Sequence, residues 1–242
     1  MTPKKHPTFK EIDAIFRPRS VAVVGASANP DTPGYDYVAS MQEFGFSGAI
    51  YPVNPKGGEI LGLAVAKSLA EVPGDVDYVI SCIPSDYILD LVGQAVQRNV
   101  KAMQLFTGRF SETGREEDVE LEGRLREAID KAGIRLIGPN CMGVLNPAHG
   151  MSFRRDMSHQ AGGVGFLSQS GNLLFEITHF GEPRGLRFSK AVSYGNALDL
   201  DETDFIEYFA RDPETKVIGA YVEGVRDGRR FLAALKRASA KK

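Results

Sequence analysis

Short apolar runs alternate with longer amphipathic stretches along most of the chain, which is typical of βαβ units built around a parallel sheet. In the N-terminal part, these runs predict strands at residues 20–25, 49–53, 77–83, 100–106 and 134–137. Apolar residues at helical spacing predict helices at residues 35–46, after an N-cap at Ser85, and at 115–132. Runs this short and apolar indicate strands that are covered on both faces.

The alternation stops between residues 146 and 163, where prolines and glycines replace any periodic pattern. It resumes with predicted strands at 164–167, 188–192 and 217–222, and predicted helices at 172–180, 202–210 and 228–239. We therefore predict two α/β domains, residues 1–147 and 148–242. The second domain has only three predicted strands, which would leave an edge strand open. This indicates an oligomer or a continuation that lies outside the sequence.

Composition narrows the class of protein. The chain has 242 residues, of which 43% are hydrophobic and 25% charged, as in ordinary soluble proteins. A net charge of −2 argues against a general nucleic-acid or membrane-surface binder. Cys82 and Cys141 form neither a metal-site pattern nor a disulfide framework. The polar N-terminus is no secretory signal and no apolar run could cross a bilayer, so we expect a cytoplasmic protein.

The first candidate site is the glycine-containing turn after the first predicted strand. It comprises Gly25, Ala26, Ser27, Ala28, Asn29 and Pro30. A turn of this kind points backbone N–H groups at a phosphate and adds the positive end of the following helix. The spacing departs from G-x-G-x-x-G, and a tight turn needed only for packing is the alternative.

The residues after the second predicted strand argue against NAD. A dinucleotide dehydrogenase usually has a carboxylate there to bind the ribose hydroxyls. This chain instead has Asn54, Pro55 and Lys56. The lysine suits a phosphate, which favours a ligand with an additional phosphate near its ribose. Coenzyme A and NADP both meet this description, and a solvated surface lysine is the alternative.

Three further strand ends carry candidate residues, because ligands bind beyond the carboxyl ends of strands in open α/β sheets. They are Ile83 and Pro84 after the third strand, Thr107 after the fourth, and Asn140 and Cys141 after the fifth. Ordinary strand terminators are the alternative. Since no histidine is tied to Cys141 by a motif, a buried thiol is a better interpretation of this residue than a nucleophile.

The second domain offers its own anion site. Ser168, Ser170 and Gly171 lie where a predicted strand passes into a helix, so hydroxyls and helix N–H groups converge there. Glu223 follows the last predicted strand, where a solvated carboxylate would also be unremarkable. One chain thus offers two phosphate-type sites, one in each domain.

Six sequence blocks, in order, resemble the CoA-binding and first ligase domains of NDP-forming acyl-CoA synthetases and are similar to the α subunit of succinyl-CoA synthetase. The blocks are PRSVAVVGAS, YPVNPKGGEILGL, IGPNCMGVLNP, FLSQSGNL, SYGNALDL and YVEGVRDGR. The resemblance implies a Rossmann-like CoA-binding domain followed by a partial flavodoxin-like domain. It also implies an acid–thiol ligase reaction, in which acyl-CoA and phosphate give CoA and an acyl phosphate, and a histidine carries the phosphoryl group to a nucleoside diphosphate.

The resemblance also implies roles for single residues. The turns at 25–27 and 54–56 would bind the nucleotide end of CoA, and Ile83, Pro84 and Thr107 would line its path. Asn140 and Cys141 would lie near the thioester.

In the second domain, Ser168, Ser170 and Gly171 would bind the phosphoryl group, and Glu223 would orient the phosphorylated histidine.

One departure from the family concerns that histidine, which lies beyond the block around Glu223 in the family. The sequence stops at Lys242, before that point, and its four histidines occupy other blocks. We therefore expect the chain alone to be inactive.

The resemblance also implies a partner and a substrate. The ATP-grasp domain or subunit, with its ADP or ATP and Mg²⁺, would lie elsewhere, and the substrate would be a small carboxylic acid. A non-catalytic CoA-binding module, as in acetyltransferase-fused relatives, is the alternative, and an NADP-dependent oxidoreductase is a third that rests on fold alone.

Overall fold

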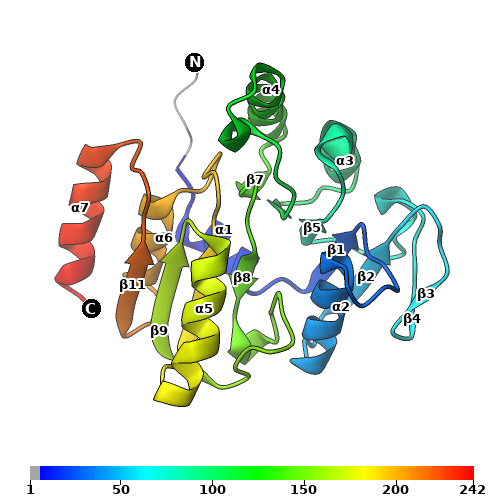
Figure 1. Ribbon diagram of the computed structural model, residues 1–242. Helices are drawn as coiled ribbons and strands as arrows, with labels where there is room; N and C mark the ends of the chain where they lie inside the picture. Colours follow the sequence, from blue (N-terminus) through cyan, green and yellow to red (C-terminus); the bar gives the residue numbers. More distant parts are fainter. Residues whose placement is uncertain (1–5) are drawn as a thin grey trace.

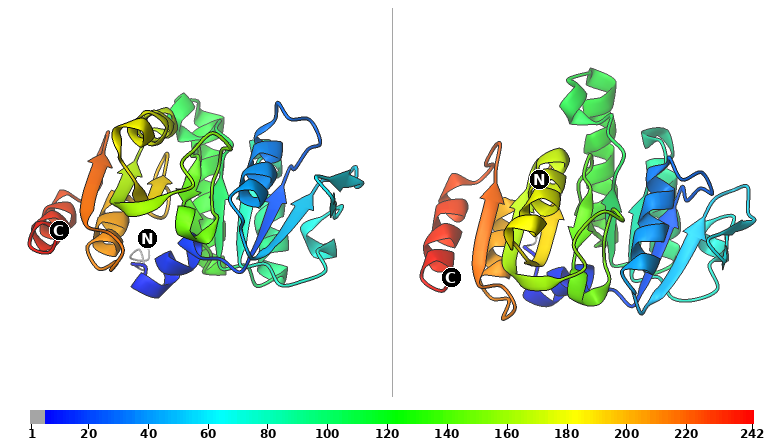
Figure 2. Two further views of the ribbon diagram at one scale, coloured as in Figure 1. Left: turned by 90° about the horizontal axis from the view of Figure 1, so that it is seen from below. Right: turned by 60° about the horizontal axis from the view of Figure 1, so that its bottom comes forward.

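The computed structural model of the protein describes residues 6–242 and contains two α/β units side by side (Figure 1). Figure 2 shows the short hairpin β3–β4 (cyan) at one end of the molecule and helix α7 (red) at the other. The mixed α/β class predicted from the alternating pattern is therefore confirmed. Among residues 6–242, no helix has the length and apolar character needed to span a bilayer.

The first unit is a five-stranded parallel sheet in the order β2-β1-β5-β6-β7. Its strands are β1 (Ser20–Val24), β2 (Ala49–Val53), β5 (Tyr78–Ser81), β6 (Ala102–Leu105) and β7 (Arg135–Ile137). Its helices are α2 (Pro33–Glu43), α3 (Ile88–Gln97) and α4 (Glu116–Ala132). The direction in which strands are added reverses between β1 and β5. Such a reversal is the point where open α/β sheets form a crevice beyond the carboxyl ends of their strands.

Both faces of this sheet are covered, as the uninterrupted apolar runs predict. Val21 and Val23 belong to the core on the side of α2, whereas Ala22 and Val24 belong to a second core on the side of α3 and α4. All five residues of β1 are buried. Burial on both faces holds β1 rigidly, and it therefore fixes the position of Gly25, where the following turn begins.

Local signals explain where the helices begin and end. Helix α2 starts with Pro33 at its first position, where the missing N–H costs nothing, and is followed by Gly45 at φ 71°. The prediction that Ser85 caps α3 is wrong. Ser85 opens a 3-10 helix (Ser85–Tyr87), and the N-cap of α3 is Tyr87, which makes no side-chain cap hydrogen bond.

The second unit is a four-stranded sheet in the order β11-β9-β10-β8. Its strands are β8 (Gly143–Leu145), β9 (Ala161–Ser168), β10 (Phe188–Ser193) and β11 (Val217–Tyr221), with helices α5 (Gly171–Gly181), α6 (Glu202–Phe209) and α7 (Gly228–Ser239). Strands β9, β10 and β11 run parallel, as predicted, but the sequence pattern missed β8, which pairs antiparallel with β10. Strand β11 forms one edge of the sheet, and its Val217 is 60% exposed.

Two elements from the predicted first domain, residues 1–147, contribute to the second unit. One is β8, and the other is helix α1 (Phe9–Phe16), which lies against α6. The Phe9 and Tyr208 rings stack at 4.9 Å, and the Tyr208 hydroxyl donates to Asp13 Oδ1 at 2.8 Å. The domain boundary at residue 147 stays a prediction, and packing between the two halves of the chain extends across it.

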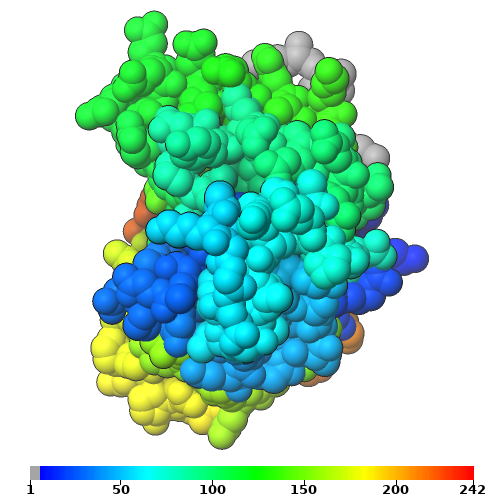
Figure 3. All heavy atoms as spheres, turned by 90° about the vertical axis from the view of Figure 1, so that its right-hand side faces the viewer, coloured from blue at the N-terminus to red at the C-terminus, as the bar shows by residue number. Residues whose placement is uncertain are grey.

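The remaining elements are short. Strands β3 (Glu59–Ile60) and β4 (Leu63–Ala64) form a hairpin between β2 and β5 that the sequence pattern did not indicate. Figure 3 faces this side of the molecule and shows the hairpin segment (cyan) at the centre of the surface. Further 3-10 helices lie at Leu69–Glu71, Ser111–Thr113, Pro147–His149 and Glu182–Arg184.

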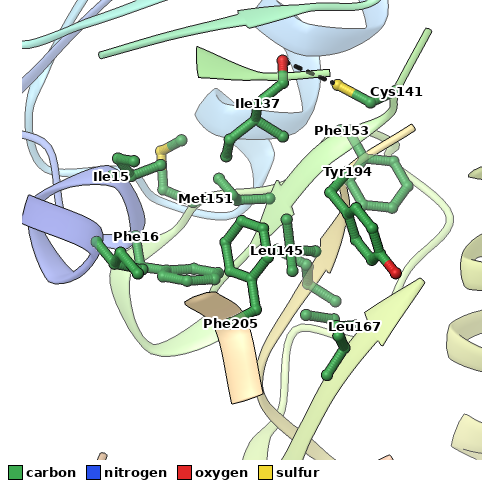
Figure 4. Packing of buried hydrophobic residues seen from close by; sticks show 14 of the residues in the cluster. Ile15, Phe16, Ile137, Cys141, Leu145, Met151, Phe153, Leu167, Tyr194 and Phe205 are labelled. Carbon is green, nitrogen blue, oxygen red and sulfur yellow. Dashed lines mark hydrogen bonds between the residues drawn. The ribbon is translucent and has the colours of Figure 1, made fainter. Parts of the chain in front are cut away.

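A single apolar core passes from the first sheet into the second. It includes Val21 and Tyr78 from the first unit together with Leu167 and Phe188 from the second. Figure 4 shows part of this core, with side chains of α1 beside Leu145, Met151 and Phe205. The two sheets are therefore held together by shared apolar burial rather than by a flexible linker.

The amino-terminal side of the second sheet is also fixed by buried charge. Lys190 is fully buried, and its Nζ lies 2.8 Å from Asp212 Oδ2 and 2.6 Å from Glu214 Oε2. Arg17, at the end of α1, lies 2.7 Å from the same Glu214 carboxylate. Burial by itself would raise the pKa of Asp212, but hydrogen bonds from Lys190 and Thr215 outweigh it and lower this pKa. The network ties α1 to β10.

A buried side-chain network connects β5, β6 and α2 of the first unit to the residue before β8. The Tyr78 hydroxyl donates to Gln104 Oε1 at 2.7 Å, and Gln104 Nε2 donates to the Tyr37 oxygen at 3.0 Å. The Tyr37 hydroxyl in turn donates to the Met142 carbonyl at 2.8 Å. Next to it, Gly143 has φ +81°, and a Cβ there would lie 1.8 Å from Gln104 Oε1. Only glycine fits at this position without displacing the buried amide.

We expect Gly143→Ala to lower the free energy of unfolding by about 1–3 kcal/mol or more, because the added methyl group overpacks the Gln104 network. Urea denaturation measures this change. The matched control is Gly123→Ala in α4, where a Cβ meets nothing within 4 Å. That variant should be up to about 1 kcal/mol more stable, since alanine favours helix. Equal effects of the two substitutions would contradict the packing argument.

Candidate functional site

A cavity of about 400 Å³ lies beyond the carboxyl ends of β1, β2 and β5, at the reversal point of the first sheet. We call it the switch-point cavity. Its lining residues come from the strand ends and from α3 with its preceding turn: Val24, Gly25, Val53, Pro55, Lys67, Ser68, Leu69, Ile83, Pro84, Tyr87, Asp90, Leu91 and Gln94. This set contains four predicted site residues from three different strand ends. The volume falls within the range of small-molecule sites.

Gly25 lets the turn after β1 pass close to β5. It has φ +89°, and a Cβ on it would lie 2.9 Å from the carbonyl carbon and oxygen of Cys82. Its N–H donates to the Val53 carbonyl at 2.9 Å, which ties this turn to the end of β2. A residue with a side chain could adopt neither this backbone conformation nor this contact without strain.

Asn54 connects the two predicted turns to each other. Its Nδ2 donates to the Ala26 carbonyl at 2.8 Å, and its Oδ1 accepts from the Lys56 N–H at 3.0 Å. Ser27 accepts from the Asn29 N–H at 3.1 Å, and Pro30 is exposed on the way to α2. The residues predicted from 25–30 and 54–56 therefore form one connected surface.

The cavity-lining cation is not the one that the sequence indicated. Lys56 is exposed and lies outside the lining set, whereas Lys67 lines the cavity. Sequence reasoning missed Lys67 because its position depends on a bridge between Val53 and Ala66, which brings residues 66–68 back to the end of β2. The role predicted for Lys56 stays a prediction.

The predicted site residues after β5, β6 and β7 lie side by side at the carboxyl ends of these neighbouring strands. Thr107 Oγ1 donates to the Ile83 carbonyl, and the Asn140 N–H donates to the Thr107 carbonyl at 3.0 Å. Asn140 is exposed and has φ 57°. On its other side, the Asn196 N–H donates to the Pro139 carbonyl at 3.0 Å. The segment 138–143, which we call the joint segment, therefore runs from the first strand edge to the second.

Cys141, in this segment, is buried and 3% exposed. Its Sγ donates to the carbonyls of Leu105 at 3.4 Å and Ile137 at 3.5 Å, and Figure 4 shows the latter contact. Burial raises the pKa of this thiol to about 12. Cys141 is thus a protonated, buried group at neutral pH, in line with the buried-thiol interpretation, and its predicted place near a thioester stays a prediction.

The turn between β9 and α5 is the second predicted anion site, and we call it the α5 turn. Ser170 is the N-cap of α5, and its Oγ accepts from the Leu173 N–H at 3.2 Å. Ser168 is fully buried and donates to the Ser170 carbonyl at 2.6 Å. A Cβ on Gly171 would lie 2.7 Å from Met142 Cγ, so the joint segment packs directly on the first turn of α5. The joint segment therefore connects Thr107, at the carboxyl end of β6, to the α5 turn.

Glu223 lies beside the α5 turn. Strands β11 and β9 place Tyr221 opposite Ser168, and the Glu223 N–H donates to Gln169 Oε1 at 2.8 Å. The same Gln169 oxygen accepts from the Gly224 N–H at 3.2 Å. Sequence reasoning missed Gln169, although it stands between two predicted residues. Glu223 is exposed, and the role predicted for it stays a prediction.

Comparison with known proteins identifies both units. Residues 19–147 match the CoA binding domain family, and residues 161–242 match the succinyl-CoA ligase like flavodoxin domain family. The chain is 38% identical over 231 residues to the ADP-forming acetate–CoA ligase II subunit alpha of Pyrococcus furiosus, covering 96% of this chain and 50% of that protein. It is 37% identical over 237 residues to a trans-feruloyl-CoA synthase from an unknown prokaryotic organism, covering 96% of this chain and 33% of that one.

Solved structures agree with these matches. The acetyl-coenzyme A synthetase 1 of Ca. Korarchaeum cryptofilum, in complex with phosphate and ADP, superposes with a TM-score of 0.89 at 33% identity. The match covers 96% of this chain and 50% of that one. A structure from Pyrococcus horikoshii superposes with a TM-score of 0.90 at 36% identity, over 96% of this chain and 53% of that one. The chain spans about half the length of the ligase α subunit from P. furiosus.

We expect both thiols to resist alkylation in the folded protein at pH 8, because burial raises the pKa of Cys82 as well as that of Cys141. Labelling by iodoacetamide, followed by mass spectrometry, should be roughly a hundredfold slower than in the urea-unfolded chain. In the Cys141→Ala variant the only remaining thiol is Cys82, so comparison with the wild type assigns the labelling rate of each cysteine. Rapid labelling of native Cys141 would show that the thiol is more accessible or more acidic than its burial indicates.

Proposed function

Because the chain belongs to the CoA-binding domain family and to the NDP-forming acyl-CoA synthetase superfamily, we propose that it is the CoA-binding portion of such a synthetase. The whole reaction converts acyl-CoA, phosphate and NDP into a carboxylic acid, CoA and NTP. The observation that carries the proposal is the joint segment, which connects the switch-point cavity region to the α5 turn. Acyl transfer from a thioester to phosphate needs these two anionic reactants side by side.

The switch-point cavity fits the nucleotide end of coenzyme A. It lies where the fold forms its ligand crevice, and Gly25 allows the backbone to approach a bound group closely. In our proposal the residues 25–27 and Pro30 face the phosphates on one side, and Asn54, Pro55 and Lys56 face them on the other. Ile83, Pro84 and Thr107 then direct the rest of the molecule along the sheet edge. Coenzyme A supplies the thiol that carries the acyl group.

The far end of this path leads to the joint segment. We assign Asn140 and Cys141 to the surroundings of the thioester, with Asn140 as the exposed polar group and Cys141 as its buried support. The neighbouring α5 turn would bind inorganic phosphate through Ser168, Ser170, Gly171 and the N–H groups of the first helical turn. A phosphate held there would be positioned next to the acyl group.

The remaining chemistry is assigned to a partner. In our proposal Glu223 accepts a hydrogen bond from the histidine that carries the phosphoryl group, and this histidine comes from outside the chain. An ATP-grasp domain or subunit would supply the ADP or ATP site and Mg²⁺. Relatives of nearly equal identity are named for acetate and for trans-ferulate, so we assign the substrate only to the class of small carboxylic acids. Dependence on CoA and ATP supports a cytoplasmic location.

Isothermal titration calorimetry with free CoA tests the proposal. We expect binding in the micromolar range, and Lys56→Ala should weaken it by about twofold to fivefold, because a solvent-exposed charge contributes up to about 1 kcal/mol. The matched control is Lys101→Ala, an exposed lysine before the amino-terminal end of β6 and away from the strand ends that line the cavity, which should leave the affinity unchanged. Affinity weaker than millimolar, with no further loss on Lys56→Ala, would refute the CoA assignment.

A further inference from the structure

The lining of the switch-point cavity has two chemically different parts. One part of the lining is formed by the strand ends together with Lys67 and Ser68, and the other by Tyr87, the N-cap of α3, and by Asp90 and Gln94 within α3. Tyr87 is 63% exposed, so a face of its ring is open to a planar group. The lining therefore offers a ligand both a cation and an aromatic ring.

The backbone on both sides of Lys67 is fixed. The Asn54 N–H donates to the Ala66 carbonyl at 2.9 Å, and the Ala66 N–H donates to the Pro52 carbonyl at 3.0 Å. On the other side, the Leu69 N–H donates to Gln94 Oε1 at 3.1 Å. Lys67 is thus held at a defined point between β2 and α3, although it belongs to a segment without regular structure.

The stem of Lys67 also has a defined course. A Cβ on Gly57 would lie 3.5 Å from Lys67 Cε and 3.7 Å from its Cγ, so the stem lies along the turn after β2. Within residues 6–242, Lys67 makes no ion pair. Asp90, a carboxylate that also lines the cavity, accepts from Gln94 Nε2 at 2.8 Å. The ammonium group of Lys67 is therefore available to an anionic ligand.

From this arrangement we propose that Lys67 binds the 3′-phosphate on the ribose of coenzyme A and makes the cavity select CoA over dephospho-CoA. The inference rests on the proposed function and adds a specificity-determining residue to it. A phosphomonoester carries a charge of about −1.5 to −2 at neutral pH, more than either diester-like phosphate of the linking diphosphate, so an uncompensated ammonium favours it. The Tyr87 ring would lie beside the adenine of the same nucleotide.

Calorimetric titration of CoA and dephospho-CoA into the wild type and Lys67→Gln tests the inference. The wild type should bind CoA about tenfold more tightly than dephospho-CoA, as expected for one charge-assisted contact. Lys67→Gln should lose most of this preference by weakening CoA alone, and Lys67→Arg should keep it. Because Lys67 is exposed, these variants should retain the wild-type thermal midpoint, which circular dichroism checks.

The outcomes separate the two proposals. If Lys67→Gln keeps the full preference for CoA, the assignment of Lys67 is overturned while CoA binding itself stands. If the wild type binds neither CoA nor dephospho-CoA below millimolar concentration, the proposed CoA-binding function itself is refuted. NADP⁺ binding as tight as that of CoA would overturn both the CoA assignment and the role of Lys67. The cavity would then bind the ribose phosphate of a different cofactor.

Discussion

A buried amide is tolerated in a protein core only when both its oxygen and its nitrogen are hydrogen-bonded, and Gln104 meets this condition at the junction of the two sheets. Its partners, Tyr78 and Tyr37, connect the first sheet and α2 to the carbonyl of Met142. Met142 then contacts Gly171 at the beginning of α5. One satisfied amide therefore fixes the distance and orientation between the switch-point cavity region and the α5 turn.

The opposite side of the second sheet is held by different forces. There, helix α1 covers α6 through stacked rings, and Arg17 joins the buried charges around Lys190. Burying such charges is costly unless every partner is present, so this network favours one arrangement of α1 over alternatives. With both sides fixed, the strand ends of the two units face the same region.

The sequence was most informative where structure is local and repetitive. The predicted strand at 49–53 and the predicted helix at 228–239 match the observed β2 and α7, because buried parallel strands and amphipathic helices leave clear periodic patterns. Strand β8 was missed because three residues carry no period and its partner, β10, lies far along the chain. Helix α1 was missed although Thr8 and Glu11 form a capping box.

The site residues show the same division. Gly25, Pro55, Ile83 and Pro84 were predicted together because the topology brings the carboxyl ends of parallel strands to one place. Lys67 and Gln169 were missed because their positions depend on contacts that only the folded chain creates.

The position of α1 has a consequence for how the protein is made. Asp13 and Tyr208 are 195 residues apart in sequence, yet they are hydrogen-bonded in the fold. During synthesis on the ribosome, α1 is made long before α6, so the part of its apolar face that packs on α6 stays uncovered until residues 202–209 have been made. Contacts of such long range form late and slowly, so the nascent chain exposes Phe9 to chaperones until its partner Tyr208 has been made.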